Sequence, residues 1–238
     1  MRLDKFFSEM GILSRKECAV AAKRGRITLD GKPVTRADVH IDPENSTVTL
    51  DGERVGYEKY LYIMLDKPAG VLSATEDKRQ STVLDLLEDR HRKLELFPCG
   101  RLDKDTTGFL LMTNDGDLAH RLLSPRYHVE KTYAYTLRDP LSVSDALRIE
   151  AGVDIGEKNI TAPAKVEPTG ENEGLITITE GKFHQIKRMF AAVGNEVTAL
   201  RRVRFGGIDI DPDLGPGGYR ELSDSEIETL RSKGEKND

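Results

Sequence analysis

The order of helix-type and strand-type segments constrains the fold of this chain more than any other feature of its sequence. Two helix-type segments open the chain, two pairs of short extended segments follow, and beyond residue 59 helices and strands are mixed without regular alternation. A doubly wound sheet requires strands and helices to alternate. The pattern therefore predicts an α+β protein, in which helices pack on a mixed and mostly antiparallel sheet.

The first part of the chain is predicted to be a small unit of its own. An apolar stripe at helical spacing opens it, and Ser14 followed by Glu17 is a capping box that begins a second helix. Two extended runs follow, and each contains an Asp-Gly pair that is typical of a tight hairpin turn. We therefore predict a small αβ domain at residues 1–56 and a larger domain at residues 59–238.

Hydrophobic periodicity gives the elements of the larger domain. Two strands separated by a Pro-Gly turn are predicted within residues 60–74, and further strands at residues 109–113, 130–138, 164–166 and 175–179. Helices are predicted at residues 81–90, 116–123, 141–153 and 184–193. The strands and helices interrupt one another irregularly, which is the basis for the predicted mixed sheet.

The charge of the chain is unevenly distributed. There are 41 acidic and 36 basic residues, a net charge of −5, which argues against indiscriminate binding to nucleic acid. Residues 1–40 nevertheless hold nine basic against five acidic side chains, and residues 182–204 hold six against one. Such stretches are either solvated surfaces or two places that hold a polyanion through its phosphates. The candidate phosphate contacts are Arg2, Arg15, Lys16, Lys23, Arg24, Arg188 and Arg202.

Several kinds of site have no signal in the sequence. The five histidines show no HxxxH or HExxH spacing, and Cys18 and Cys99 stand alone in apolar stretches, so we expect buried reduced thiols and no metal site. Neither GxGxxG nor GxxxxGKS/T occurs, so no nucleotide cofactor is expected. Apolar runs such as Leu61–Leu65 are far too short to span a membrane, and the start MRLDKFFSEM lacks the apolar core of a signal peptide. We expect a cytoplasmic protein without membrane contact.

The segment CGRLDKDTTGFLLMT contains the leading candidate for a catalytic group. Asp103 lies in a polar loop between Gly100 and Gly108, directly before an apolar strand that would hold the loop rigid. Arg101 and Lys104 flank it, and their charge would keep a carboxylate ionised and attract phosphate. The alternative is a solvated turn that leads into a strand and has no function.

Two further segments contain candidate site residues. In EGKFHQIKRMFAAVGN, Lys187 lies at the flank of a helical apolar stripe, so its long side chain can place the ammonium in a neighbouring cleft. In EKTYAY, Tyr133 and Tyr135 fall on the same face of a strand and offer a flat ring on which a base can stack. The alternatives are a surface lysine that lies along the core and tyrosines that pack within it.

These segments, together with three others, resemble the pseudouridine synthases, and specifically the RsuA branch that modifies ribosomal RNA. MRLDKFFSEMGILSRKECAVAAKRGRITLDGKPV resembles an S4 RNA-binding module, LDKPAGVLSA the opening of the catalytic domain and GRLDKDTTGFLLMTNDG its active-site loop. SPRYHVEKTY, EGKFHQIKRMFAAVGNEV and LRRVRFGGI follow in the family's order. The resemblance covers almost the entire chain and implies an S4-like RNA-binding domain at residues 1–56 and a catalytic domain at residues 59–238.

The resemblance also implies a role for individual residues. Asp103 corresponds to the catalytic aspartate, Tyr133 to the tyrosine that lies against the target base, and Lys187 to the basic partner of the aspartate. Arg101 corresponds to the residue that inserts into the RNA stack when the uridine leaves it. The lysine at position 187 favours the RsuA branch, because related branches usually carry arginine there. We expect a monomer that binds ribosomal RNA and converts a uridine to pseudouridine without a metal or cofactor.

Within this branch, the sequence looks closest to enzymes that make the single pseudouridine of small-subunit ribosomal RNA, at position 516 of 16S RNA. An enzyme of the same branch acting on 23S RNA remains open, as does an RNA-binding assembly factor with an idle pocket. A hydrolase that uses Asp103 and Asp105 as a carboxylate pair is disfavoured, because residues two apart on an extended loop tend to point to opposite sides.

Overall fold

The computed structural model describes residues 1–57, 59–92 and 94–234, which form two compact units. One unit is Met1–Leu61 with Leu87–Leu96, and the other is Tyr62–Leu86 with Phe97–Asp238. The sequence gives no signal that Leu87–Leu96 belongs to the same unit as Met1–Leu61. The division into domains at residues 1–56 and 59–238 stays a prediction. No helix in the described part of the chain is long and apolar enough to cross a lipid bilayer.

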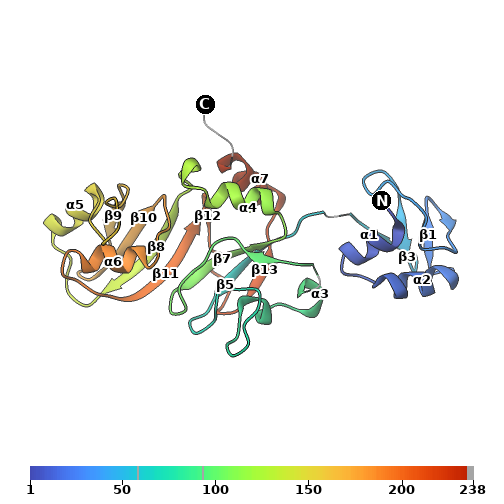
Figure 1. The fold of residues 1–238 in the computed structure, drawn as a ribbon, viewed down its shortest axis with the longest axis horizontal. Helices are drawn as coiled ribbons and strands as arrows, with labels where there is room; N and C mark the ends of the chain where they lie inside the picture. The colour runs from blue at the N-terminus through green and yellow to red at the C-terminus, as the bar shows by residue number, and fades with distance from the viewer. Residues whose placement is uncertain (58, 93, 235–238) are drawn as a thin grey trace. The chain divides into compact units, whose positions relative to one another are not determined.

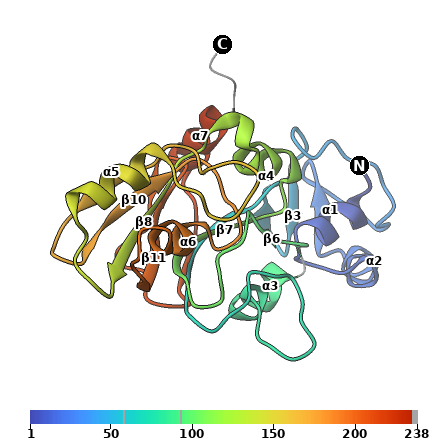
Figure 2. The ribbon, with the colours of Figure 1, turned by 60° about the vertical axis from the view of Figure 1, so that its left-hand side comes forward.

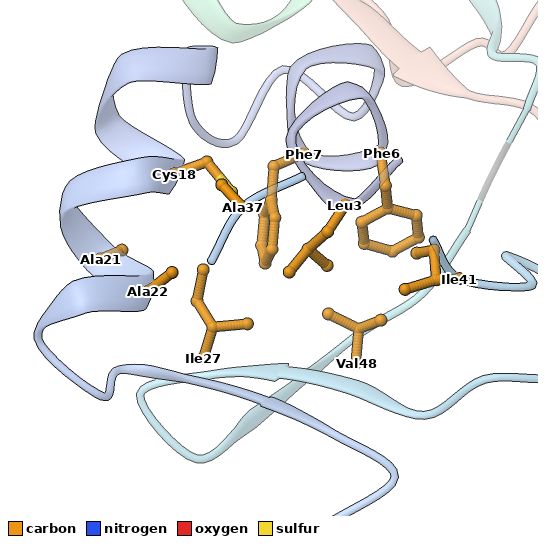
Figure 3. Close-up of a cluster of buried hydrophobic side chains, with 10 residues drawn as sticks. All are labelled: Leu3, Phe6, Phe7, Cys18, Ala21, Ala22, Ile27, Ala37, Ile41 and Val48. Carbon is orange, nitrogen blue, oxygen red and sulfur yellow. The ribbon is translucent and has the colours of Figure 1, made fainter. Parts of the chain in front are cut away.

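The first unit packs two helices against a four-stranded antiparallel sheet (Figure 1). The helices are α1 (Leu3–Glu9) and α2 (Arg15–Lys23), and the strands in sheet order are β2 (Lys32–Pro33), β1 (Ile27–Leu29), β3 (Val48–Leu50) and β4 (Glu53–Val55). Figure 3 shows that Phe6 and Phe7 from α1, Cys18 from α2 and Ile27 from β1 point into one buried core. The predicted pair of helices followed by two hairpins is confirmed.

Local interactions explain why these elements begin and end where they do. The Ser14 hydroxyl accepts a hydrogen bond from the Glu17 amide at 3.3 Å, and the Glu17 carboxylate accepts one from the Ser14 amide at 2.7 Å, which completes the capping box of α2. Both hairpin turns place an Asp-Gly pair in the left-handed region, with φ of 49° and 77° at Asp30-Gly31. Tight two-residue hairpins require this backbone, which glycine and aspartate tolerate better than most residues.

The second unit is built on one nine-stranded sheet (Figure 1). Its strands follow the order β13 (Tyr219–Glu221), β5 (Tyr62–Lys67), β7 (Thr107–Thr113), β11 (Val197–Phe205), β8 (Lys131–Leu137), β10 (Glu173–Ile178) and β9 (Lys165–Pro168). β6 (Phe97–Pro98) pairs with β7, and β12 (Ile208–Asp209) pairs with β11. Among the described strands only β7 and β11 run parallel, so the predicted mixed and mostly antiparallel sheet is confirmed.

Helices lie against the sheet and against one another (Figure 2). α4 (Gly116–Leu123) contacts α7 (Asp224–Lys233) and η2, a 3₁₀ turn at Pro125–Tyr127. On the sheet, α5 (Val143–Ala151) contacts β9, and α6 (Gln185–Ala191) contacts β11. These helices include those predicted at residues 116–123, 141–153 and 184–193. Because β11 follows α6 and pairs with β7, the start of α6 lies beside the loop that precedes β7.

Two predictions for residues 60–90 are wrong. The helix predicted at residues 81–90 is a 3₁₀ turn, η1 (Val83–Leu86), followed by the single-turn α3 (Asp89–Arg92). The chain passes from one compact unit to the other between Leu86 and Leu87, within the predicted helix, and the helical structure is interrupted there. The second strand predicted within residues 60–74 is only an isolated bridge between Leu72 and Thr82, and beside it the Ser73 hydroxyl bonds to the backbone of Leu102.

The sequence patterns also missed the strand at the centre of the sheet. β11 has nine residues, and three of them are arginines. In the sequence this segment therefore looks like a run of basic charge rather than an apolar strand. The alternating burial along β11 becomes visible only once β7 and β8 flank it. This strand carries the parallel pairing that joins the two halves of the sheet.

Gly108 is expected to be the most sensitive glycine of the central sheet. It has φ of +97°, and a Cβ atom there would lie 2.2 Å from the Arg202 carbonyl oxygen on β11. We expect Gly108→Ala to lower the free energy of unfolding by about 3 kcal/mol or more, because neither the backbone nor the strand spacing can accommodate the methyl group. Gly116→Ala on α4, where nothing lies within 4 Å, is the control. Equal denaturant midpoints for the two variants would contradict this expectation.

Candidate active site

The loop that carries Asp103 is held by buried groups of the sheet. Lys67, at the end of β5, is fully buried and donates hydrogen bonds to the carbonyl oxygens of Thr106 at 2.9 Å and Lys104 at 3.3 Å. Burial lowers the pKa of this lysine to about 8, so near neutral pH it still carries its proton. The Gly70 amide also donates to the Lys104 carbonyl at 2.8 Å. Asp103 therefore lies in a fixed loop, as predicted for the segment before β7.

Lys187 extends from α6 to two carboxylates of this loop. Its Nζ atom lies 3.2 Å from Asp103 Oδ2 and 2.6 Å from Asp105 Oδ1. Burial alone would lower the pKa of Lys187, but its hydrogen bonds to the two aspartates outweigh that effect and raise the pKa. The hydrogen bond from Lys187 lowers the pKa of Asp105. The Lys187 ammonium therefore lies between two carboxylates, those of Asp103 and Asp105.

The expectation that Asp103 and Asp105 point to opposite sides is wrong. The Thr106 amide donates to the Asp103 carbonyl at 3.1 Å, so this stretch is a turn rather than an extended strand. Both carboxylates consequently contact the same ammonium. Asp105 is nevertheless far more exposed than Asp103, so the two groups have different surroundings.

His184 is a site residue that the sequence analysis did not single out. Its Nε2 atom lies 3.5 Å from Asp103 Oδ1, and its backbone is left-handed with φ of 48° at the residue before α6. The available signal was its position three residues before Lys187, because side chains at that spacing share one face of a helix. His184 and Lys187 therefore approach Asp103 from the same segment.

Tyr133 forms a wall of the pocket that contains Asp103. The tyrosine lies on β8 and is only 7% exposed. Tyr135, two residues along the same strand, is also buried but packs on Phe190 at 4.8 Å between ring centroids and belongs to the core. The pocket is lined by Arg101, Leu102, Asp103, Thr106, Tyr133, Ile178, His184, Lys187 and Leu200, among others. A flat ring on an apolar floor, beside a carboxylate and cations, suits a planar polar molecule such as a base.

The candidate phosphate contacts fall into different environments. Arg15, Lys16, Lys23 and Arg24 are exposed on or directly after α2, whereas Arg2 forms an ion pair with Asp4 at 2.6 Å. Arg101 is exposed beside the pocket. Arg188 donates to Glu157 at 2.8 Å and to the Phe183 carbonyl at 2.9 Å, so its guanidinium is engaged within the fold.

The assignment of Arg202 as an RNA contact is wrong, because its side chain is buried. The residue is 2% exposed, its Nε atom donates to the Phe109 carbonyl at 2.6 Å, and its guanidinium lies 4.9 Å from the centre of the Phe205 ring. Alternation along β11 turns Arg202 inward, while its neighbour Arg201 reaches Asp66 through two hydrogen bonds of 2.9 Å. Counting charges along the chain cannot detect this difference.

The chemistry of the pocket is that of ionisable side chains and an aromatic ring. Within the described residues there is no group of three or more histidine, cysteine, aspartate or glutamate side chains arranged to hold a metal ion. Cys18 and Cys99 are buried and free, as predicted. Burial raises the pKa of Cys99 to about 12, which makes this thiol unreactive at neutral pH.

Comparison with known proteins identifies the family. The RNA pseudouridylate synthase family matches residues 61–192, more than half of the chain, and the S4 domain family matches residues 1–46. YtzG of Bacillus subtilis, described as an uncharacterized RNA pseudouridine synthase, is 50% identical over 97% of this chain and 98% of its own length. Ribosomal small subunit pseudouridine synthase A of Escherichia coli is 43% identical over 97% of this chain and 100% of its own length.

A solved structure shows the same relationship in three dimensions. The crystal structure of a pseudouridylate synthase superposes with a TM-score of 0.69 at 38% sequence identity, and it covers 97% of this chain and 99% of that one. The family match, the close relatives and the fold agree along almost the whole length. This chain belongs to the RNA pseudouridine synthases, isomerases that act on RNA, and it begins with an S4 domain.

Proposed function

We propose that the protein isomerises one uridine of small-subunit ribosomal RNA to pseudouridine, with Asp103 as the catalytic carboxylate. The observation that carries this proposal is the convergence of Asp103, Lys187 and Tyr133 on one pocket from three separate segments. Asp103 acts on the ribose or base of the bound uridine, Lys187 balances its charge, and the Tyr133 ring lies against the base. Arg101, exposed at the pocket, occupies the space that the uridine leaves in the RNA stack.

The reaction balances within the substrate. The bond between N1 of uracil and C1′ of ribose breaks, the base rotates while bound, and a bond forms between C5 and C1′. C5 loses a proton and N1 gains one, so no other reactant is needed. A positioned carboxylate is a competent covalent catalyst, and a neighbouring cation offsets the energy of removing it from water.

Binding requires the target base to leave its stack. Base flipping costs a few kcal/mol, which stacking on Tyr133 and phosphate contacts elsewhere on the protein offset. The exposed basic residues of α2 supply such contacts in the proposed RNA-binding domain at residues 1–56, and the proposed catalytic domain at residues 59–238 holds the pocket. The protein is proposed to act as a monomer in the cytoplasm.

The proposed substrate is the uridine at position 516 of 16S ribosomal RNA. The name of the Escherichia coli relative, at 43% identity over its full length, supports a small-subunit target. Lys187, where related branches usually carry arginine, supports the same branch. An enzyme acting on 23S RNA and an assembly factor with an idle pocket are the alternatives that the test separates.

The test measures tritium released from RNA labelled at C5 of its uridines. Purified protein is incubated with small-subunit RNA, with large-subunit RNA and with a partly assembled small subunit, and Asp103→Asn serves as the inactive control. We expect release from the small-subunit substrate by the wild-type protein alone. Release only from large-subunit RNA would change the proposed target, and no release from any substrate would favour the assembly factor.

Neutralising two cations of α2 is expected to weaken RNA binding in a salt-dependent way. Arg15 and Lys16 are exposed, so their phosphate contacts would release counterions from RNA. For Arg15→Gln combined with Lys16→Gln, we expect the slope of log affinity against log salt to become shallower by about 1.4 to 1.8. Arg26→Gln combined with Arg36→Gln is the matched control, because both arginines are paired with aspartates. Equal slopes would mean that α2 does not contact phosphate.

A further inference from the structure

A large aromatic side chain is exposed at the edge of the active site. Phe183 is 72% exposed, although it lies between Lys182 and His184 in the segment that leads into α6. Its ring stacks on the His184 ring with 3.8 Å between centroids and 19° between planes. Since His184 covers one face of Phe183 and the residue is largely exposed, an apolar aromatic surface remains in contact with solvent.

This aromatic pair is continuous with the pocket. His184 lines the pocket, and its Nε2 atom lies 3.5 Å from Asp103. Phe183 does not line the pocket, but its ring stacks on that of His184, which does. The two stacked rings therefore extend from the pocket toward solvent. A nucleotide bound beside the uridine in the pocket would therefore lie within reach of Phe183.

The backbone around the pair is fixed by hydrogen bonds. The Phe183 carbonyl accepts one from Arg188 Nη1 at 2.9 Å, and the Lys182 amide donates one to Gln185 Oε1 at 2.8 Å. Gln185 in turn donates to Glu180 at 2.7 Å. An aromatic surface that is already ordered loses little conformational entropy when a partner stacks on it.

The surrounding charge favours RNA as the partner. Arg101 is exposed and lines the same pocket, whereas the ammonium of Lys182 is paired with Glu180 at 3.6 Å and that of Lys187 with Asp103 and Asp105. An exposed arginine beside an exposed flat ring matches a nucleotide, which offers a phosphate and a planar base. A single ring pair is also much smaller than the apolar patch that marks a protein interface.

We propose that Phe183 is a stacking platform for an unpaired nucleobase adjacent to the target uridine. This inference rests on the proposed function, because it assumes that the uridine occupies the pocket of Asp103. Base stacking on an aromatic side chain is tolerant of sequence, so Phe183 contributes affinity rather than target choice. Loss of one such stack is expected to weaken RNA binding about 5- to 150-fold.

The test compares two substitutions of Phe183 in the full-length protein. Phe183→Leu keeps an apolar side chain but removes the ring, whereas Phe183→Tyr keeps the ring. The probes are five-residue oligoribonucleotides with a central uridine and 2-aminopurine on its 5′ or its 3′ side, whose fluorescence is quenched when the base stacks. We expect quenching with one of the two probes for the wild type and Phe183→Tyr, and weaker binding without quenching for Phe183→Leu.

A probe with an abasic residue in place of 2-aminopurine completes the comparison. For the wild type, the abasic probe should bind more weakly than the intact probe, by the same factor that Phe183→Leu loses with the intact probe. For Phe183→Leu, the two probes should bind equally. In the tritium assay the loss for Phe183→Leu should fall on KM rather than on kcat, and its unfolding midpoint should match that of the wild type. A purely structural role would not produce this pattern.

The results separate the platform from the reaction. If Phe183→Leu binds and quenches like the wild type, or if both proteins lose the same affinity with the abasic probe, the platform is refuted. If the wild type fails to quench either probe, it is refuted as well. Quenching and binding that depend on Phe183, without tritium release, would support the platform and contradict the proposed isomerase reaction.

Discussion

Asp103→Asn is expected to reduce turnover by about 10⁴-fold or more while the fold and RNA binding are retained. The amide has nearly the same shape as the carboxylate, but it can neither form a covalent intermediate nor accept a proton at neutral pH. Lys187 keeps its contact with Asp105 at 2.6 Å, so its ammonium does not lose all its partners. The measurement is single-turnover tritium release at saturating RNA.

Asp105→Asn is the matched control for this substitution. It removes the other carboxylate that contacts Lys187, at a group that is 72% exposed. We expect this variant to keep most of the activity, because Asp105 does not line the pocket that contains Tyr133. If Asp103→Asn retained activity and Asp105→Asn lost it, the catalytic carboxylate would have to be reassigned to Asp105.

Lys187→Met is expected to lower kcat by roughly 10² to 10³, the effect of removing one preorganised electrostatic contact. It leaves two carboxylates close together without the cation that separates their charges. The stability effect should stay within about 1 kcal/mol, because Lys187 and Asp103 are each 25% exposed and water screens the pair. Rapid-quench turnover and denaturant unfolding measure the two effects separately.

The pH dependence of stability provides an additional test for Lys187. The hydrogen bond from Lys187 lowers the folded-state pKa of Asp105 below its ordinary value of 3.8, so this stabilisation is present above that pH and is lost as the pH falls further. The small difference in stability between the wild type and Lys187→Met should therefore shrink below pH 3.8. A difference that grows with acidity would contradict this ion pair.

Lys187→Arg is the conservative control. It keeps the positive charge but replaces a compact ammonium by a planar fork with different reach. We expect activity between that of the wild type and that of Lys187→Met, since the charge is restored without the original geometry. Equal loss in the Met and Arg variants would show that position, rather than charge, is the requirement at this residue.

Short-range signals were sufficient for most elements of the fold. The capping box at Ser14 and Glu17, and the two Asp-Gly turns, depend on contacts between residues a few positions apart, and all are present in the structure. The apolar strand at residues 109–113 was equally visible, because strands buried on both faces have continuous apolar sequences. Such features are encoded locally and can be identified without knowing the rest of the chain.

Long-range pairing explains what the sequence patterns missed. β11 looked like a charged segment, and only its position between β7 and β8 decides that Arg202 is buried while Arg201 reaches Asp66. Likewise, the helix predicted at residues 81–90 is interrupted where the chain passes from one compact unit to the other, between Leu86 and Leu87. In each case a contact made in the folded state outweighed the local preference.

The sequence by itself determined which chemical groups the site contains: a carboxylate in a rigid loop at Asp103, a lysine at the flank of a helix and a tyrosine on a strand. Only the tertiary structure decided their neighbours. Lys187 and Asp105 are separated by 82 positions in the chain and meet because β11, which follows α6, pairs with β7, which follows the loop. The same pairing brought His184 to Asp103. Distances between distant segments depend on strand order, and no local pattern encodes strand order.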